Sequence, residues 1–64
     1  MVGNNIRRLR MEHEWTQEEL ADRLGVSRSA MGNYEREQRE PGIDMLIRLA
    51  DIFGITVDAL VGRN

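Results

Sequence analysis

The stretch SRSAMGN, residues 27–33, places polar side chains of a particular kind at helical spacing. Arg28 carries a planar guanidinium that can donate to guanine O6 and N7 together, and the amide of Asn33 can pair with adenine N6 and N7. Ser29 lies four residues before Asn33, so a helix would present both on one face. These residue types at this spacing suit the reading of base edges in double-stranded DNA.

Less specific interpretations of the same residues stay open. Arg28 could contact a phosphate or only water, Asn33 could be an ordinary exposed helix residue, and Ser27 is expected to cap the helix before it touches DNA. Gly32 either lets the helix backbone approach the bases or is a tolerated exposed glycine that costs about 1 kcal/mol relative to alanine. The first alternative predicts that Gly32→Ala stabilises the fold and weakens specific binding.

Repeated helix-start signals predict the elements that would position these residues. The clearest is Thr16, which can cap a helix while Glu19 reaches back to close a capping box. Further signals are the caps Ser27, Gly42 and Thr56 and the C-terminal glycines Gly25 and Gly54. They predict five helices, at about residues 4–13, 17–24, 28–36, 43–53 and 57–61.

Each predicted helix carries an apolar stripe that can face a common core. The stripes are Ile6/Leu9, Leu20/Ala21/Leu24, Met31/Tyr34, Ile43/Leu46/Ala50/Phe53 and Val57/Leu60. The short loops between them suit a compact all-α bundle that takes up residues 1–64 as one domain. A tight turn containing Gly25 joins the second and third helices, which is typical of a helix-turn-helix.

Composition limits the other classes of function. The chain has a net charge of −2, nine basic residues that are all arginine, and no cysteine. The acidic balance counts against bulk nucleic-acid binding. The missing lysine reflects either genome composition or the value of arginine's rigid fork for phosphate and guanine. Without cysteine there is no disulfide or thiolate metal site, and no apolar run approaches the ~18 residues of a membrane span.

Enzyme chemistry has no residues to support it. His13 stands alone, and the chain has neither a glycine-rich phosphate loop nor a nucleophile motif. We therefore expect a cytoplasmic protein that is not an enzyme, with no cofactor, metal, small-molecule ligand or membrane partner.

A wider pattern of residues is spread over roughly residues 4–61. It consists of Ile6-Arg7-x-Leu9-Arg10, Thr16-Gln17-x-Glu19-Leu20-Ala21-x-x-Leu24-Gly25-Val26-Ser27, Tyr34-Glu35-Arg36, Pro41, Leu46-x-x-Leu49-Ala50 and Phe53-Gly54-Ile55. Through these residues the chain resembles the Cro/phage-repressor (Cro/C1-type) helix-turn-helix family, also called the xenobiotic-response-element family. The resemblance implies a lambda-repressor-like five-helix bundle whose third helix enters the DNA major groove.

The resemblance also implies two sets of DNA contacts. Bases would be contacted by Ser27, Arg28, Ser29, Gly32 and Asn33, and phosphates by Thr16, Gln17, Arg10, Arg36 and Arg39. Gln17 opens a helix, where its amide and free backbone N–H groups can hold a phosphate, although it could be an ordinary surface residue. Glu37 replaces a glycine usual in the family and, with Glu40, weakens the local positive field. The loop arginines could therefore simply be solvated.

Two structural roles follow from the same resemblance. Arg10 and Glu35 would form a partly buried salt bridge between the first and third helices, since a charge among apolar residues needs a partner. A dimer interface would include Met45, Leu49, Ile52, Val57 and Val61. Alternatively, Met45 and Ile52 are isolated exposed apolar residues.

The sequence as a whole favours a sequence-specific DNA-binding transcriptional regulator, such as a repressor, that binds an inverted repeat as a homodimer. The alternative is a protein-interaction module on the same fold, antitoxin-like or regulator-binding. Steep salt dependence of DNA binding would distinguish the first from the second.

Overall fold

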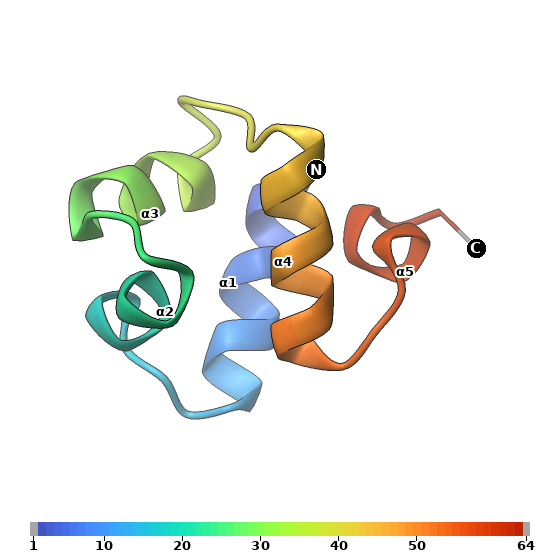
Figure 1. Cartoon of the computed structure of the whole chain (residues 1–64), viewed down its shortest axis with the longest axis horizontal. Coiled ribbons are helices and arrows are strands. Elements are labelled where there is room, and N and C mark those ends of the chain that lie inside the picture. The colour runs from blue at the N-terminus through green and yellow to red at the C-terminus, as the bar shows by residue number, and fades with distance from the viewer. Residues whose placement is uncertain (1, 64) are drawn as a thin grey trace.

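The computed structural model describes residues 2–63, which form five α-helices and, within that range, no strand. The helices are α1 (Val2–Glu12), α2 (Gln17–Leu24), α3 (Arg28–Glu35), α4 (Ile43–Phe53) and α5 (Val57–Val61). Helices α2 and α3 lie together at one end of the molecule and α5 lies at the other, with α1 and α4 between them (Figure 1). The all-α five-helix prediction is therefore confirmed.

Side-chain caps fix where three of the helices begin. Thr16 Oγ1 accepts from the Glu19 N–H at 3.0 Å, and the Glu19 carboxylate accepts from the Thr16 N–H at 2.9 Å, which closes the predicted capping box. The hydroxyls of Ser27 and Thr56 each accept from the backbone N–H three residues further on, at 3.0 Å. These bonds occupy N–H groups that have no partner inside a helix, so α2, α3 and α5 begin at the predicted residues.

Each of the five helices is followed, within two residues of its last, by a residue in the left-handed backbone conformation. Three of these residues are Gly25, Gly54 and Gly62, and the other two are Glu14 (φ 59°) and Glu37 (φ 60°). After Glu37, the Gln38 N–H donates back to the Asn33 carbonyl at 3.0 Å, the bond that closes a Schellman end. Glu37 thus keeps the left-handed turn, although this conformation is unfavourable for residues with a Cβ.

The core draws side chains from every helix. It consists of Ile6, Leu9, Leu20, Ala21, Leu24, Met31, Leu49, Ala50, Phe53 and Leu60. On α4 the predicted stripe was wrong in one respect, because Ile43 is 64% exposed and Leu49 is 0% exposed. The two residues are six positions apart, or about 120° around a helix, so they cannot both face the core. Leu49 is therefore not available to a partner, and its place in the predicted dimer interface is wrong.

Helix α1 starts two residues earlier than predicted and packs closely on the end of α3. A Cβ built on Gly3 would lie 2.5 Å from the Tyr34 carbonyl oxygen and 2.9 Å from that of Glu35. Further along α1, Asn5 Nδ2 donates to the Leu60 carbonyl at 2.9 Å and so ties α1 to α5. No helix within residues 2–63 combines the length and hydropathy that crossing a membrane requires.

Candidate nucleic-acid interface

The helix-turn-helix is formed by α2 and α3, which pack against each other. Gly25 ends α2 with φ 71°, and its N–H donates to the Ala21 and Asp22 carbonyls. Val26 packs against the core, and Ser27 then caps α3. Three residues thus connect the two helices, and the first turn of α3 lies at the surface.

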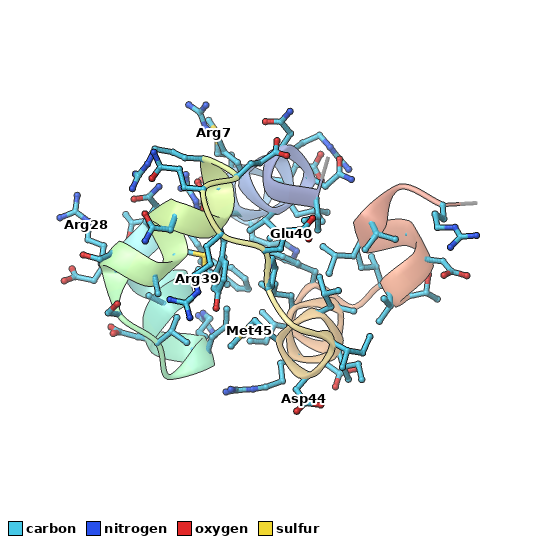
Figure 2. The ribbon with its side chains drawn as sticks, turned by 90° about the horizontal axis from the view of Figure 1, so that it is seen from above. Arg7, Arg28, Arg39, Glu40, Asp44 and Met45 are labelled. Atoms are coloured by element: carbon cyan, nitrogen blue, oxygen red, sulfur yellow. The ribbon has the colours of Figure 1, made fainter. Side chains whose placement is uncertain are left out.

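The outward face of α3 carries the residues predicted to contact bases. Arg28 and Ser29 are exposed, and Arg28 extends away from the body of the molecule (Figure 2). A hollow beside them is lined by Gln17, Arg28, Ser29, Gly32, Asn33 and Arg36. Residues from the start of α2 and along α3 therefore meet on one surface.

A second hollow continues this surface towards α1. It is lined by Arg10, Thr16, Gln17, Glu18 and Arg28. Gln17 and Arg28 line both hollows, so the two are adjacent. Together they bring in all the predicted DNA contacts except Ser27, whose hydroxyl caps α3, and Arg39, which is exposed in the loop between α3 and α4.

A buried carboxylate, that of Glu35, ties this surface to α1 and α2. Arg10 donates to it from Nε at 2.7 Å and from Nη2 at 3.1 Å, so the expected ion pair is present. Arg10 Nη1 also donates to the Trp15 carbonyl at 2.8 Å. Its side chain is only 13% exposed. Arg10 is thus engaged within the fold, and we assign it no phosphate contact.

Gln17 joins the same cluster, with Nε2 donating to Glu35 Oε1 at 3.2 Å. Its side-chain amide nitrogen therefore points inward. The backbone N–H of Gln17 remains, because the first N–H groups of a helix have no carbonyl partner inside it. A phosphate at this end of α2 would meet that N–H and the positive end of the helix dipole.

Gly32 differs from its expected surroundings. It is buried, and the nearest atoms to a Cβ at this position all belong to the side chain of Arg36. Arg36 Nη2 also donates to Asn33 Oδ1 at 2.9 Å. In the sequence, the contact between Gly32 and Arg36 is signalled only by their spacing of four residues.

The charge of Glu19 is favoured by its position at the start of α2. The hydrogen bond from the Thr16 backbone N–H, with a further one to the Thr16 side chain and the nearby Arg23 guanidinium, lowers the pKa of the Glu19 carboxyl below its usual value of 4.5. The lowered pKa favours the charged carboxylate, which stabilises the start of α2 beside the surface that would meet DNA.

The predicted dimer surface is only partly exposed. Met45, Ile52 and Val57 pack against the core from the side, and Val61 is half-buried. The large apolar residues that stand most exposed on α4 are instead Ile43 and Ile47, at 64% and 45%. Their spacing of four residues could have indicated a shared outward face.

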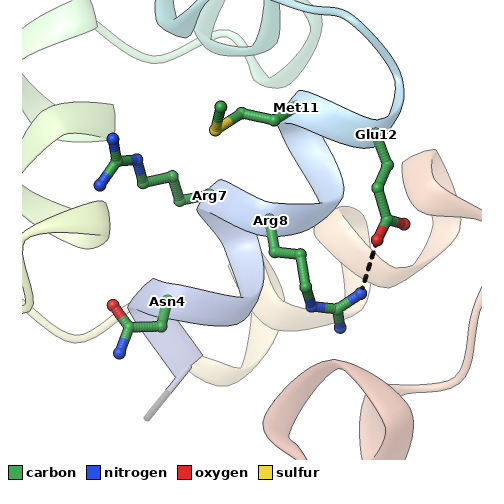
Figure 3. A pocket seen from close by; sticks show the side chains of 5 residues that line it. All are labelled: Asn4, Arg7, Arg8, Met11 and Glu12. Atoms are coloured by element: carbon green, nitrogen blue, oxygen red, sulfur yellow. Dashed lines mark hydrogen bonds and ion pairs between the residues drawn. The ribbon is translucent and has the colours of Figure 1, made fainter.

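The exposed face of α1 carries a separate hollow. It is lined by Asn4, Arg7, Arg8, Met11 and Glu12 and shares no residue with the two hollows beside α3. Across it Arg8 Nη1 pairs with Glu12 Oε2 at 2.9 Å, while Arg7 extends away from that pair (Figure 3). Within residues 2–63 no cluster of three or more His, Cys, Asp or Glu side chains could hold a metal ion.

Comparison with known proteins identifies the class. A family model described as helix-turn-helix matches residues 6–60, and the chain belongs to this family. The uncharacterized HTH-type transcriptional regulator YobD of Bacillus subtilis (strain 168) is 37% identical over 62 residues, which are 97% of this chain and 55% of YobD. The chain thus spans about half the length of that relative.

Among the solved structures that share the fold at about 30% identity are two complexes with DNA. The P22 c2 repressor in complex with a synthetic operator superposes with a TM-score of 0.87 at 30% identity, over 94% of this chain and 91% of that one. The biofilm regulator SinR in complex with DNA gives 0.86 at 29% identity, over 95% of this chain and 98% of that one. The lambda-repressor-like arrangement expected from the sequence is therefore confirmed.

Proposed function

We propose that this chain is a sequence-specific DNA-binding transcriptional regulator that places α3 in the major groove of an operator. The observation that carries the proposal is the exposed first turn of α3, where Arg28 and Ser29 stand free of the core. Helix-turn-helix proteins contact base edges with the first turn of the second helix of the motif, which is α3 here. The P22 c2 repressor and SinR, which share the fold, were both solved with DNA.

Arg28 is the strongest candidate for reading a base. Within residues 2–63 its guanidinium donates no hydrogen bond to another side chain or carbonyl, so its fork is available for guanine O6 and N7. Ser29 lies beside it and can donate or accept, so it predicts no particular base. The Ser27 hydroxyl already accepts from the Ala30 N–H as the cap of α3, so a contact of Ser27 with DNA would be additional to that bond.

Phosphate contacts would come from both sides of this turn. Thr16 and the backbone N–H of Gln17 stand at the start of α2, where the helix dipole favours a negative charge. Arg39, in the exposed loop after α3, would lie along the backbone on the other side. Such contacts fix the position of a protein on the duplex without selecting a sequence.

We further propose that two chains bind one inverted repeat. Two recognition helices related by a dyad would lie about 34 Å apart, one turn of DNA. The half-buried residues Met45, Ile52, Val57 and Val61 remain the candidates for a contact between copies. Sedimentation of the complex with a selected duplex should give two chains per duplex, and one chain per duplex would exclude the dimer.

The proposal is tested by selecting bound duplexes from a random library, with Arg28→Ala in parallel. The expected result is an inverted repeat with half-site centres about 10 base pairs apart, and loss of one guanine preference in the variant. Arg63→Ala, altered at an exposed residue beyond α5, should select the same motif as the wild type. If the wild type enriches no sequence at low salt, the fold serves protein contacts instead, and the proposed function is wrong.

A further inference from the structure

The side chain of Arg36 lies back over Gly32 on the outward face of α3. A Cβ built on Gly32 would stand 2.8 Å from Arg36 Nη1 and 3.4 Å from both Cζ and Nη2. A contact of 2.8 Å is far inside van der Waals separation, so the guanidinium could not keep this place over any other residue. Position 32 thus gives Arg36 a seat that only glycine leaves open.

Two hydrogen bonds hold the guanidinium in that seat. Arg36 Nη2 donates to Asn33 Oδ1 at 2.9 Å, and Nε donates to Gln38 Oε1 at 3.4 Å. A guanidinium has five N–H donors. With no further bond from Arg36 to residues 2–63, both N–H groups of Nη1 and one of Nη2 are left for an outside acceptor.

The seated guanidinium faces the same surface as the first turn of α3. Arg36, Gly32 and Asn33 line one hollow together with Arg28 and Ser29. A ligand that meets Arg28 in this hollow therefore also meets Arg36. The guanidinium lies over Gly32 and is bonded to Asn33, both in α3, and its second bond goes to Gln38 in the loop beyond the helix. Its contacts with α3 therefore help to set its position relative to Arg28.

We propose that Arg36 is a specificity-determining residue that donates to a guanine of the operator, with Gly32 as its seat and Asn33 as a positioning residue. The proposal rests on the proposed function and replaces a phosphate contact at Arg36 with a base contact. It also removes Asn33 as a reader of adenine. The Asn33 Oδ1 atom, which would accept from adenine N6, already accepts from Arg36.

The spacing along α3 predicts where the second guanine lies. The Arg36 guanidinium lies over Gly32, which is four residues from Arg28, or about 6 Å along a helix axis. That distance corresponds to roughly two steps of 3.4 Å along the duplex. Each half-site should therefore contain two guanine preferences a few base pairs apart, one for each arginine.

The experiment selects duplexes from a random library with the wild type, Arg36→Ala and Arg39→Ala, and then measures affinity for the selected and a scrambled duplex. Arg36→Ala should lose the second guanine preference while the first remains. Its affinity should fall about 5- to 150-fold for the selected duplex, and much less for the scrambled one. Arg39→Ala, from the exposed loop, should lower the affinity for both duplexes equally and leave the selected motif unchanged.

Two substitutions test the seat and the positioning role. Gly32→Ala, which keeps Arg36 but fills its seat, should lose the same guanine preference with an undiminished melting temperature. Asn33→Asp keeps an oxygen that accepts from Arg36, so the guanine preference should persist although the added negative charge lowers affinity for all DNA. Asn33→Ala removes that oxygen and should weaken the preference.

The possible failures are distinct. A motif from the wild type that is unchanged in Arg36→Ala, with equal losses on both duplexes, would make Arg36 a phosphate contact and overturn this proposal alone. Loss of an adenine preference in Asn33→Asp would assign Asn33 to a base and overturn its positioning role. Absence of any motif with the wild type would overturn both this proposal and the proposed function.

Discussion

Arg10 and Glu35 form a two-point ion pair across the α1–α3 contact, with nitrogen–oxygen distances of 2.7 and 3.1 Å. The Glu35 side chain is 3% exposed and that of Arg10 is 13% exposed. Gln17 adds a third donor to the same carboxylate. One buried charge thereby joins α1, α2 and α3 just beneath the surface proposed to meet DNA.

Removing one partner of this pair should be costly. Arg10→Met leaves the Glu35 carboxylate buried with only Gln17 as a donor, and we expect a loss of about 3–5 kcal/mol in the free energy of unfolding. The measurement is urea or thermal denaturation followed by circular dichroism. Arg7→Met, at an exposed position on the same helix, is the matched control and should change stability by less than about 0.5 kcal/mol. Equal losses in the two variants would contradict the structural role of the pair.

Replacing a glutamate in the left-handed conformation by glycine should stabilise the fold. Glu14 adopts φ 59° after α1, a conformation that costs a residue with a Cβ about 1–2 kcal/mol. Glu14→Gly removes this cost and a negative charge at a helix C-terminus, against an entropic loss of about 0.4–1 kcal/mol. We expect a higher melting temperature. Glu40→Gly, where φ is not positive, should lower it, and a fall in both variants would contradict the account.

Two glycines should respond in opposite directions to alanine. At Gly3 a Cβ meets backbone carbonyl oxygens at 2.5 and 2.9 Å, which cannot move without separating α1 from α3. Gly3→Ala should therefore lose about 1–3 kcal/mol. At Gly32 the obstacle is the end of a flexible arginine, so Gly32→Ala should be neutral or gain up to about 1 kcal/mol. Both variants are compared by their denaturation midpoints. A higher midpoint for Gly3→Ala than for Gly32→Ala would contradict this prediction.

Acid should weaken the start of α2 through Glu19. The pKa of this carboxyl is lowered in the folded chain from 4.5, so its contribution to stability is present above that value and is lost as pH falls through the folded pKa. Glu19→Gln keeps a capping side chain but cannot titrate. The stability gap between wild type and variant should be widest near pH 7 and shrink below pH 4.5. A gap that is constant from pH 7 to pH 3 would contradict this.

Much of the fold could be predicted because its signals are local. Thr16, Ser27 and Thr56 each cap a helix through a bond to the third residue on, and that spacing is visible in the sequence. The ion pair of Arg10 with Glu35 was accessible only through the family resemblance, since 25 residues separate its members.

The errors arose where the answer depends on tertiary contacts. Helix α4 is apolar around much of its circumference, so its periodicity alone could not decide between Ile43 and Leu49 for the core. The role of Gly32 was also hidden, because it depends on the rotamer of Arg36 rather than on residue type. Glu37, which replaces a glycine usual in the family, adopts the left-handed backbone conformation nonetheless.

The central claim is that α3 binds a particular DNA sequence, and the most direct test is the affinity for the selected and a scrambled duplex, measured by fluorescence anisotropy across a salt series. We predict tighter binding of the selected duplex at every salt concentration. We also predict that log K falls steeply with log salt, with a slope near −0.9 for each phosphate contacted. Equal affinity for both duplexes, or binding that salt does not weaken, would contradict the claim.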